Sequence, residues 1–118
     1  MKVIVNGKII VENEVLENKT LVFDDKIIAI KEQSAIDGNV NAIIDAKGMY
    51  IAPGFIDLHI HGYLGYDMMD ATQKALDHIS NELCKNGVTS FLPATMTMDM
   101  INIHKALEAI RDKMGNAA

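Results

Sequence analysis

The residues of this chain that could carry chemistry are concentrated in one short segment, residues 53–62. The segment is mostly aliphatic and opens on a Pro-Gly turn signal, so it is predicted to be a buried strand. Because side chains alternate across a strand, Asp57, His59 and His61 share one face, a combination that an ordinary apolar core avoids. Two imidazoles spaced i, i+2 near a strand end can reach one divalent ion, for which imidazole is a usual ligand.

The spacing alone leaves two interpretations open. His59 and His61 could bind a metal ion, or they could be a pair of hydrogen-bonded histidines at the end of a strand. Asp57 lies two residues behind on the same face. Its carboxylate could orient an imidazole beside a metal ion, or it could accept hydrogen bonds from backbone N–H groups.

Composition narrows the class of protein. The chain has 118 residues, 49% hydrophobic and 23% charged, which is typical of one folded domain, or of one domain and part of another. A net charge of −5 without a long basic run argues against nucleic acid and membrane as partners. The single cysteine, Cys84, excludes an internal disulfide and fits a cytoplasmic location. No apolar run approaches the roughly 20 residues that span a bilayer.

The elements before this segment predict a small antiparallel β-domain over residues 1–52. One hairpin is expected at the Asn-Gly pair 6–7, and a second at the Asp-Asp pair 24–25. Another short strand is expected over 42–46. The domain contains no cluster of catalytic residue types, so we interpret it as a packing module.

Residues 53–118 follow a different pattern: strand, helix, strand, helix, with short links that imply parallel pairing. The first helix is expected to start near Asp70 or Thr72, with Asp70 in a capping box, and to end at the Asn-Gly pair 86–87. A second helix is expected after Thr97 or Asp99. Three apolar faces could pack inward: Ile56, Leu58 and Ile60 on the first strand; Leu76, Ile79 and Leu83 on the first helix; Ile103, Leu107, Ile110 and Met114 on the second. Two strands and two helices are too few to bury all three faces, so we expect part of this apolar surface to stay exposed.

The segment in this context resembles the first barrel strand of the amidohydrolase superfamily, whose two motif histidines bind metal at the mouth of a (β/α)8 barrel. Residues 62–71 resemble the loop that follows this strand in N-acetylglucosamine-6-phosphate deacetylases, and residues 86–95 resemble their second strand. The resemblance implies an α/β fold. The first βαβα portion of an incomplete TIM barrel, residues 53–118, would follow a β-sandwich-like domain, residues 1–52. A whole barrel needs about 250 residues, so we expect an N-terminal fragment.

The resemblance also implies a reaction. His59 and His61 would bind one or two divalent ions, zinc or iron, in the full-length protein. A metal-activated water would then split N-acetylglucosamine 6-phosphate into glucosamine 6-phosphate and acetate. The other ligands of the family, a Glu and two His, and its catalytic Asp would lie beyond residue 118. No residue of this chain is assigned a catalytic role, and the chain alone is expected to be inactive.

Other functions stay open at this point. The full-length protein could be a dihydroorotase-like amidohydrolase or a deaminase. The chain could also be a non-catalytic β-module that serves as an assembly element. A quarter of a barrel leaves strand edges open, so we expect self-association into a homo-oligomer.

Overall fold

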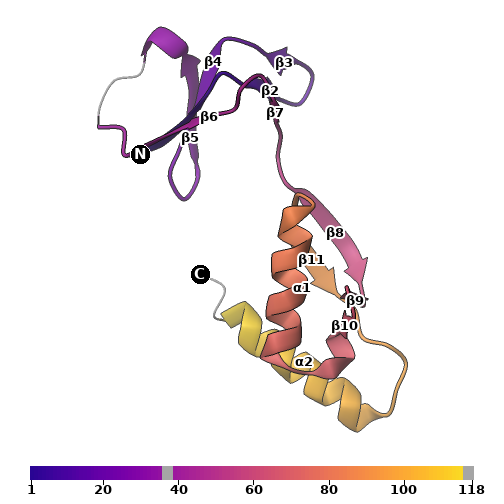
Figure 1. Ribbon diagram of the computed structural model, residues 1–118. Coiled ribbons are helices and arrows are strands. Elements are labelled where there is room, and N and C mark those ends of the chain that lie inside the picture. The colour runs from indigo at the N-terminus through magenta and orange to yellow at the C-terminus, as the bar shows by residue number, and fades with distance from the viewer. Residues whose placement is uncertain (36–38, 116–118) are drawn as a thin grey trace. The chain divides into compact units, whose positions relative to one another are not determined.

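The computed structural model describes residues 1–35 and 39–115. The chain divides into two compact units, Met1–Pro53 and Gly54–Ala118. The first unit is built from strands and one short 3-10 helix, η1 (Gln33–Ala35), and the second unit carries the α-helices (Figure 1). None of the helices in the described residues is long and apolar enough to cross a membrane.

The first unit contains two small sheets. A four-stranded sheet has the order β5-β4-β1-β6, and a three-stranded sheet has the order β3-β2-β7. The strands are β1 (Lys2–Val5), β2 (Lys8–Ile10), β3 (Val15–Leu16), β4 (Lys19–Phe23), β5 (Ile27–Glu32), β6 (Ala42–Asp45) and β7 (Tyr50–Ile51). The buried residues of this unit are Val3, Gly7, Ile9, Thr20, Leu21, Val22 and Ala46.

The prediction of a hairpin at residues 6–7 is wrong. Strand β1 pairs with β4 and, in parallel, with β6, whereas β2 pairs with β3 and, in parallel, with β7. Asn6 does bend the chain, with φ 55°, but the bend passes it from one sheet to the other. The Asn6 side chain donates to the Asp45 carboxylate over 3.0 Å. The turn is therefore held by a residue far along the chain and not by pairing of β1 with β2. The module is therefore mixed, and the prediction of an antiparallel domain fails at its two parallel pairings.

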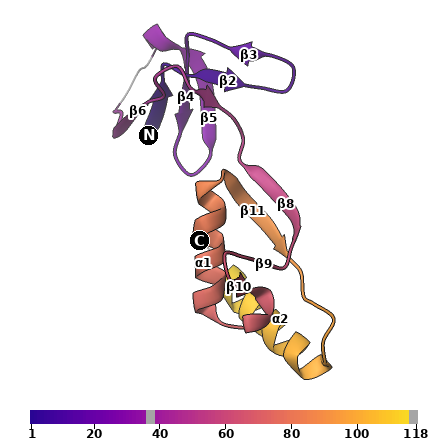
Figure 2. The ribbon, with the colours of Figure 1, turned by 45° about the vertical axis from the view of Figure 1, so that its right-hand side comes forward.

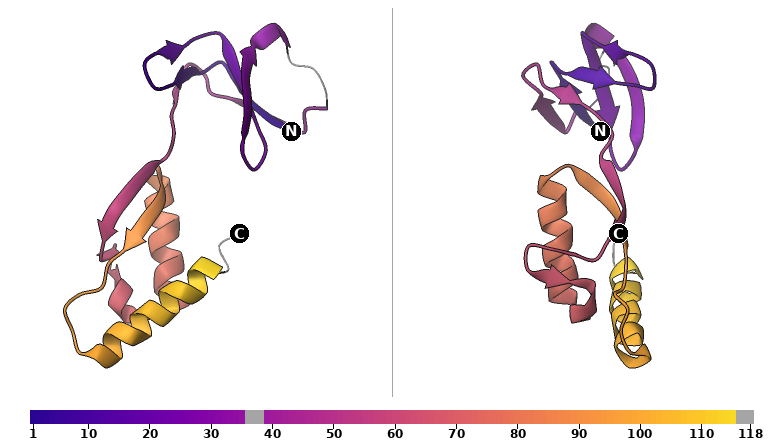
Figure 3. Two further views of the ribbon diagram at one scale, coloured as in Figure 1. Left: turned by 180° about the vertical axis from the view of Figure 1, so that it is seen from behind. Right: turned by 90° about the vertical axis from the view of Figure 1, so that its right-hand side faces the viewer.

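The second predicted hairpin is confirmed. Strands β4 and β5 pair antiparallel as a hairpin (Figure 3). The Asp24 N–H donates to the Lys26 carbonyl over 3.0 Å in the turn between them. The strand expected over 42–46 is also present, as β6.

The predicted order strand, helix, strand, helix is confirmed in the second unit. Strands β8 (Phe55–Ile60) and β11 (Val88–Pro93) form a two-stranded parallel sheet, and α1 (Gln73–Lys85) lies along it (Figure 1, Figure 2). Helix α2 (Met100–Gly115) packs against α1 and against the 3-10 helix η2 (Met68–Asp70). A short hairpin of β9 (Gly62–Tyr63) and β10 (Tyr66–Asp67) joins β8 to η2.

Side-chain caps fix where the two α-helices begin. Thr72 is the N-cap of α1, and its hydroxyl accepts from the Ala75 N–H over 3.2 Å. Asp99 accepts from the Asn102 N–H over 3.0 Å, and this hydrogen bond holds the pKa of the Asp99 carboxyl below its usual value. Gly87, with φ +80°, follows the end of α1 as predicted.

The capping box predicted for Asp70 belongs to a different helix. Asp67 is the N-cap of η2, and its N–H donates to the Asp70 carboxylate over 2.9 Å. The capping box was therefore predicted three residues too far along the chain, because the sequence does not reveal the short 3-10 helix that precedes α1.

The apolar stripes were predicted correctly for α1 and only in part for α2. Leu76, Ile79 and Leu83 are all buried, and Ile110 of α2 packs against them. Two members of the predicted α2 stripe are instead exposed, Leu107 at 49% and Met114 at 72%. Fully buried Ala106 takes the inward position, because α2 turns its small residues toward η2 and α1.

The aliphatic face of β8 is left exposed at two of its three residues, in agreement with the expectation that a quarter of a barrel cannot bury every apolar face. Ile56 and Leu58 are 63% and 71% exposed, and only Ile60 packs against the core. The core of this unit gathers between α1, η2 and the carboxyl end of β8, so in the described residues no helix covers the first half of the strand.

Ile79→Ala removes a fully buried side chain from the centre of this core. We expect the free energy of unfolding of the second unit to fall by about 2–5 kcal/mol, measured by urea denaturation followed by circular dichroism. Leu107→Ala is the control on the exposed face of α2 and should cost about 1 kcal/mol or less. Equal losses from the two variants would contradict this orientation of α2.

Candidate metal centre

The structure brings the two histidines of the motif together. His59 lies in β8, and His61 follows the end of the strand. Their Nε2 atoms are 3.1 Å apart, and their rings meet edge to face with centroids 4.9 Å apart. The alternation of a strand thus continues one residue beyond the β8 ladder and turns both rings to the same side.

Backbone hydrogen bonds hold His61 in place after β8 ends. The Ala94 N–H donates to the Ile60 carbonyl over 2.8 Å and so extends the pairing of β8 with β11. Nδ1 of His61 lies 3.0 Å from the Ala94 carbonyl oxygen. The His61 carbonyl accepts from the N–H of Met68, a buried core residue, over 2.7 Å. The histidine is therefore tied both to β11 and to the hydrophobic core.

Asp57 contacts the backbone of this site. Its Oδ1 accepts from the His59 N–H over 3.0 Å. Within the described part of the chain, the Asp57 carboxylate makes no hydrogen bond to an imidazole nitrogen. This contact corresponds to the second interpretation of Asp57 given above, a carboxylate bonded to a backbone N–H.

The histidine pair suits a divalent ion in donor type and spacing. Zinc–imidazole bonds of about 2.0–2.1 Å place two nitrogens about 3.3 Å apart at a tetrahedral angle and about 2.9 Å apart at a right angle. The observed 3.1 Å lies between these values. Among residues 1–35 and 39–115, however, no group of three or more His, Cys, Asp or Glu side chains is placed to hold an ion. The pair therefore fits as part of a ligand set.

The β9–β10 hairpin that leaves the site depends on a glycine. A Cβ on Gly62 would collide with the Tyr66 carbonyl oxygen and come within 2.8 Å of the Asp67 Cα, and both are backbone atoms. Leu64 and Gly65 form the turn with φ 48° and 84°. The loop after the histidines is therefore an ordered structure with little room for change.

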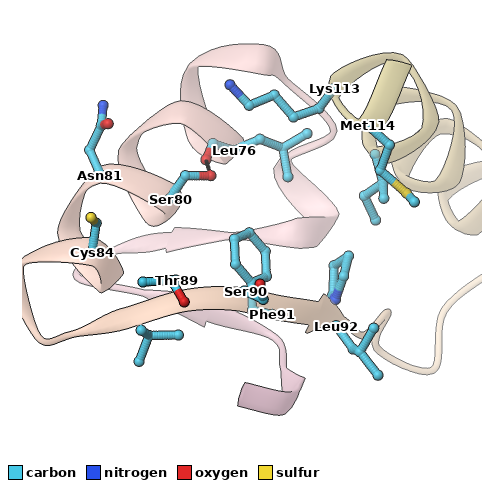
Figure 4. A pocket seen from close by; sticks show the side chains of 13 residues that line it. Leu76, Ser80, Asn81, Cys84, Thr89, Ser90, Phe91, Leu92, Lys113 and Met114 are labelled. Carbon is cyan, nitrogen blue, oxygen red and sulfur yellow. Dashed lines mark hydrogen bonds between the residues drawn. The ribbon is translucent and has the colours of Figure 1, made fainter. Parts of the chain in front are cut away.

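The second unit also has a groove, which lies away from the two histidines. It has a volume of about 630 Å³ between α1, β11 and α2, and its walls are mainly apolar (Figure 4). Neither His59 nor His61 lines it. Phe91, Leu92 and Met114 lie along it, so the groove follows the side of β11 that faces away from β8.

Sequence reasoning missed the two backbone groups that hold His61, the Ala94 carbonyl and the Met68 N–H. Backbone groups leave no signature in residue type. The available signal was positional, since Ala94 directly follows the strand that was expected to pair with the histidine strand.

Gly62→Ala should disrupt the hairpin and, through Met68, the support of His61. We expect a loss of about 1–3 kcal/mol in the unfolding free energy of the second unit, from overpacking against backbone. Ala71→Gly, at the residue that follows η2, is the comparison change. Ala71 has φ 51°, so glycine there should be neutral or slightly stabilising. Urea denaturation of both variants measures the difference, and an unaffected Gly62→Ala protein would contradict the hairpin geometry.

Comparison with known proteins places this geometry in a family. No protein-family model matches the chain. It is 37% identical over 105 residues to an N-acetylglucosamine-6-phosphate deacetylase of Bacillus subtilis, covering 88% of this chain and 26% of the relative. A dihydroorotase of Staphylococcus aureus is 41% identical over 66 residues, covering 52% of this chain and 14% of the relative.

A solved structure supports the same assignment. The crystal structure of N-acetylglucosamine-6-phosphate deacetylase from Pasteurella multocida superimposes with a TM-score of 0.89 and 32% identity, over 97% of this chain and 30% of that one. The chain thus spans about a quarter of the length of the first curated relatives that it matches. Over that stretch the resemblance read from the sequence is confirmed, and the family is that of the N-acetylglucosamine-6-phosphate deacetylases in the amidohydrolase superfamily.

Proposed function

We propose that this chain supplies part of the metal site of a hydrolase that converts N-acetylglucosamine 6-phosphate to glucosamine 6-phosphate and acetate. The observation that carries the proposal is the convergence of the His59 and His61 Nε2 atoms, 3.1 Å apart, in a chain similar to deacetylases of that substrate. In this proposal residues 1–52 belong to a β-domain, and residues 53–118 are the first βαβα portion of a (β/α)8 barrel.

The residues of the chain divide the work of holding the site. His59 and His61 would hold one or two divalent ions, zinc or iron, and the Asp57 carboxylate would hold the backbone N–H of His59. A divalent ion bound there would supply an activated water and polarise the amide carbonyl of the substrate. The partner of the protein is thus a small amino-sugar phosphate, and we place the reaction in the cytoplasm.

The chain alone should be inactive. Two imidazoles make an incomplete ligand set, and no third ligand joins them in the described residues. The further ligands and the proton-transfer group would come from residues outside this sequence.

A cyclic amidohydrolase is the second candidate, favoured by the similarity to the S. aureus dihydroorotase. Full-length protein assayed on N-acetylglucosamine 6-phosphate and on dihydroorotate distinguishes the two. We expect deacetylation of the sugar phosphate, and turnover of the cyclic amide alone would overturn the proposal. A non-catalytic assembly element is the third candidate.

Metal titration tests the site directly. The 118-residue chain should bind Zn²⁺ in isothermal titration calorimetry, and His59→Ala/His61→Ala should abolish binding because both donors are lost. His104→Ala, on the exposed face of α2, is the matched control and should leave the affinity unchanged. Equal binding by the double variant and the original chain would contradict the site and favour the assembly element.

We also propose that the isolated chain self-associates. Phe55, Ile56 and Leu58 of β8 are each at least 63% exposed, and the apolar groove runs along β11. Burying these surfaces against a second copy would remove apolar area from water. Light scattering should show a mass that rises with concentration, and Leu58→Lys should reduce it. A constant monomer mass over a broad concentration range would contradict self-association.

A further inference from the structure

The contact between His61 and Ala94 determines where one hydrogen atom lies. Nδ1 of His61 is 3.0 Å from the Ala94 carbonyl oxygen. A carbonyl oxygen has no hydrogen to donate, so Nδ1 must carry the N–H of this bond. In a neutral imidazole the other nitrogen then has a free lone pair. The Ala94 carbonyl thus turns the lone pair of His61 Nε2 toward His59.

This assignment fixes the hydrogen on the second ring as well. The Nε2 atoms of His59 and His61 are within hydrogen-bond distance at 3.1 Å. Because Nε2 of neutral His61 can only accept, Nε2 of neutral His59 must donate. One hydrogen therefore lies between the two nitrogens that a shared cation would bind. On binding a cation through both Nε2 atoms, His59 has to change tautomer, whereas His61 already has the tautomer that binding needs.

Backbone contacts with β8 fix the position of Ala94. Its N–H donates over 2.8 Å to the carbonyl of Ile60, the residue directly before His61. Pro93, the residue before it, is the last residue of β11 and is paired with Ile60. Proline fixes its own φ, which limits the directions in which the chain can leave the strand.

We infer that the Ala94 peptide is a positioning group that holds His61 as the Nδ1–H tautomer and presents its Nε2 to a divalent cation. The purpose of this device rests on the proposed metal function, but the tautomer is a property of the metal-free chain. Fixing ring orientation through the nitrogen opposite the metal is a general device of histidine ligands, and losing it costs about 10–100-fold in metal affinity.

The first experiment measures the tautomers without metal. Long-range proton–nitrogen NMR spectra of the ¹⁵N-histidine-labelled chain, at a pH where both rings are neutral, separate the nitrogen that carries hydrogen from the one that does not. We expect Nδ1–H for His61 and Nε2–H for His59, with His104 as the solvent-exposed reference. The Nε2–H tautomer at His61 would overturn the inference.

The second experiment removes the support. Ala94→Pro deletes the N–H that bonds to Ile60, and Ala94→Ser keeps both backbone groups. We expect Zn²⁺ affinity to fall 10–100-fold in Ala94→Pro and to change less than threefold in Ala94→Ser, and the His61 tautomer should become mixed only in Ala94→Pro. Unchanged affinity and tautomer in a folded Ala94→Pro chain would overturn the inference. If that variant unfolds, the tautomer measured in the original chain still decides it.

The two experiments separate this inference from the proposed function. A chain that shows the expected tautomers but binds no Zn²⁺ supports the positioning role of Ala94 and contradicts the metal site. A chain that binds Zn²⁺ through both histidines with His61 in the Nε2–H tautomer before binding supports the metal site and contradicts the positioning role.

Discussion

The parallel pairing of β8 with β11 is the interaction on which the candidate site depends. It places the residue after Pro93 beside the residue before His61, and the bond from the Ala94 N–H to the Ile60 carbonyl completes the ladder there. Without it the two histidines would lie on an unpaired strand. With it, one ring is oriented by a neighbouring strand and the other meets it at hydrogen-bond distance.

The hydrophobic core supports this pairing from one side. Leu76, Ile79 and Leu83 of α1 pack with Met68, and Val88 and Phe91 of β11 contact the same cluster. Met68 also donates its N–H to His61. The same residue thus belongs to the core and to the backbone of the site, so packing and ligand geometry are coupled. Substitutions in the core near Met68 should therefore shift the position of His61 even when the chain stays folded.

Much of this arrangement could be predicted from the sequence, because local signals govern it. The histidine strand, the stripe of α1 and the glycine after it follow from periodicity and turn chemistry. The sequence did not reveal the partners of β1 and β2, because the Asn-Gly turn signal is local whereas the choice of sheet depends on residues 42–51. The inward face of α2 was also missed, since Leu107 and Ala106 compete for it and tertiary packing selects the smaller residue.

The two parallel pairings of the first unit have a consequence for how the chain folds. Residue 2 pairs with residue 42, and residue 8 with residue 50. During synthesis β1 and β2 can pair early with β4 and β3, but their parallel partners become available only after about fifty residues have left the ribosome. The β4–β5 hairpin can form earlier from neighbouring residues. Non-local closure is slow compared with such local steps, so the two parallel pairings should set the folding rate of the amino-terminal unit.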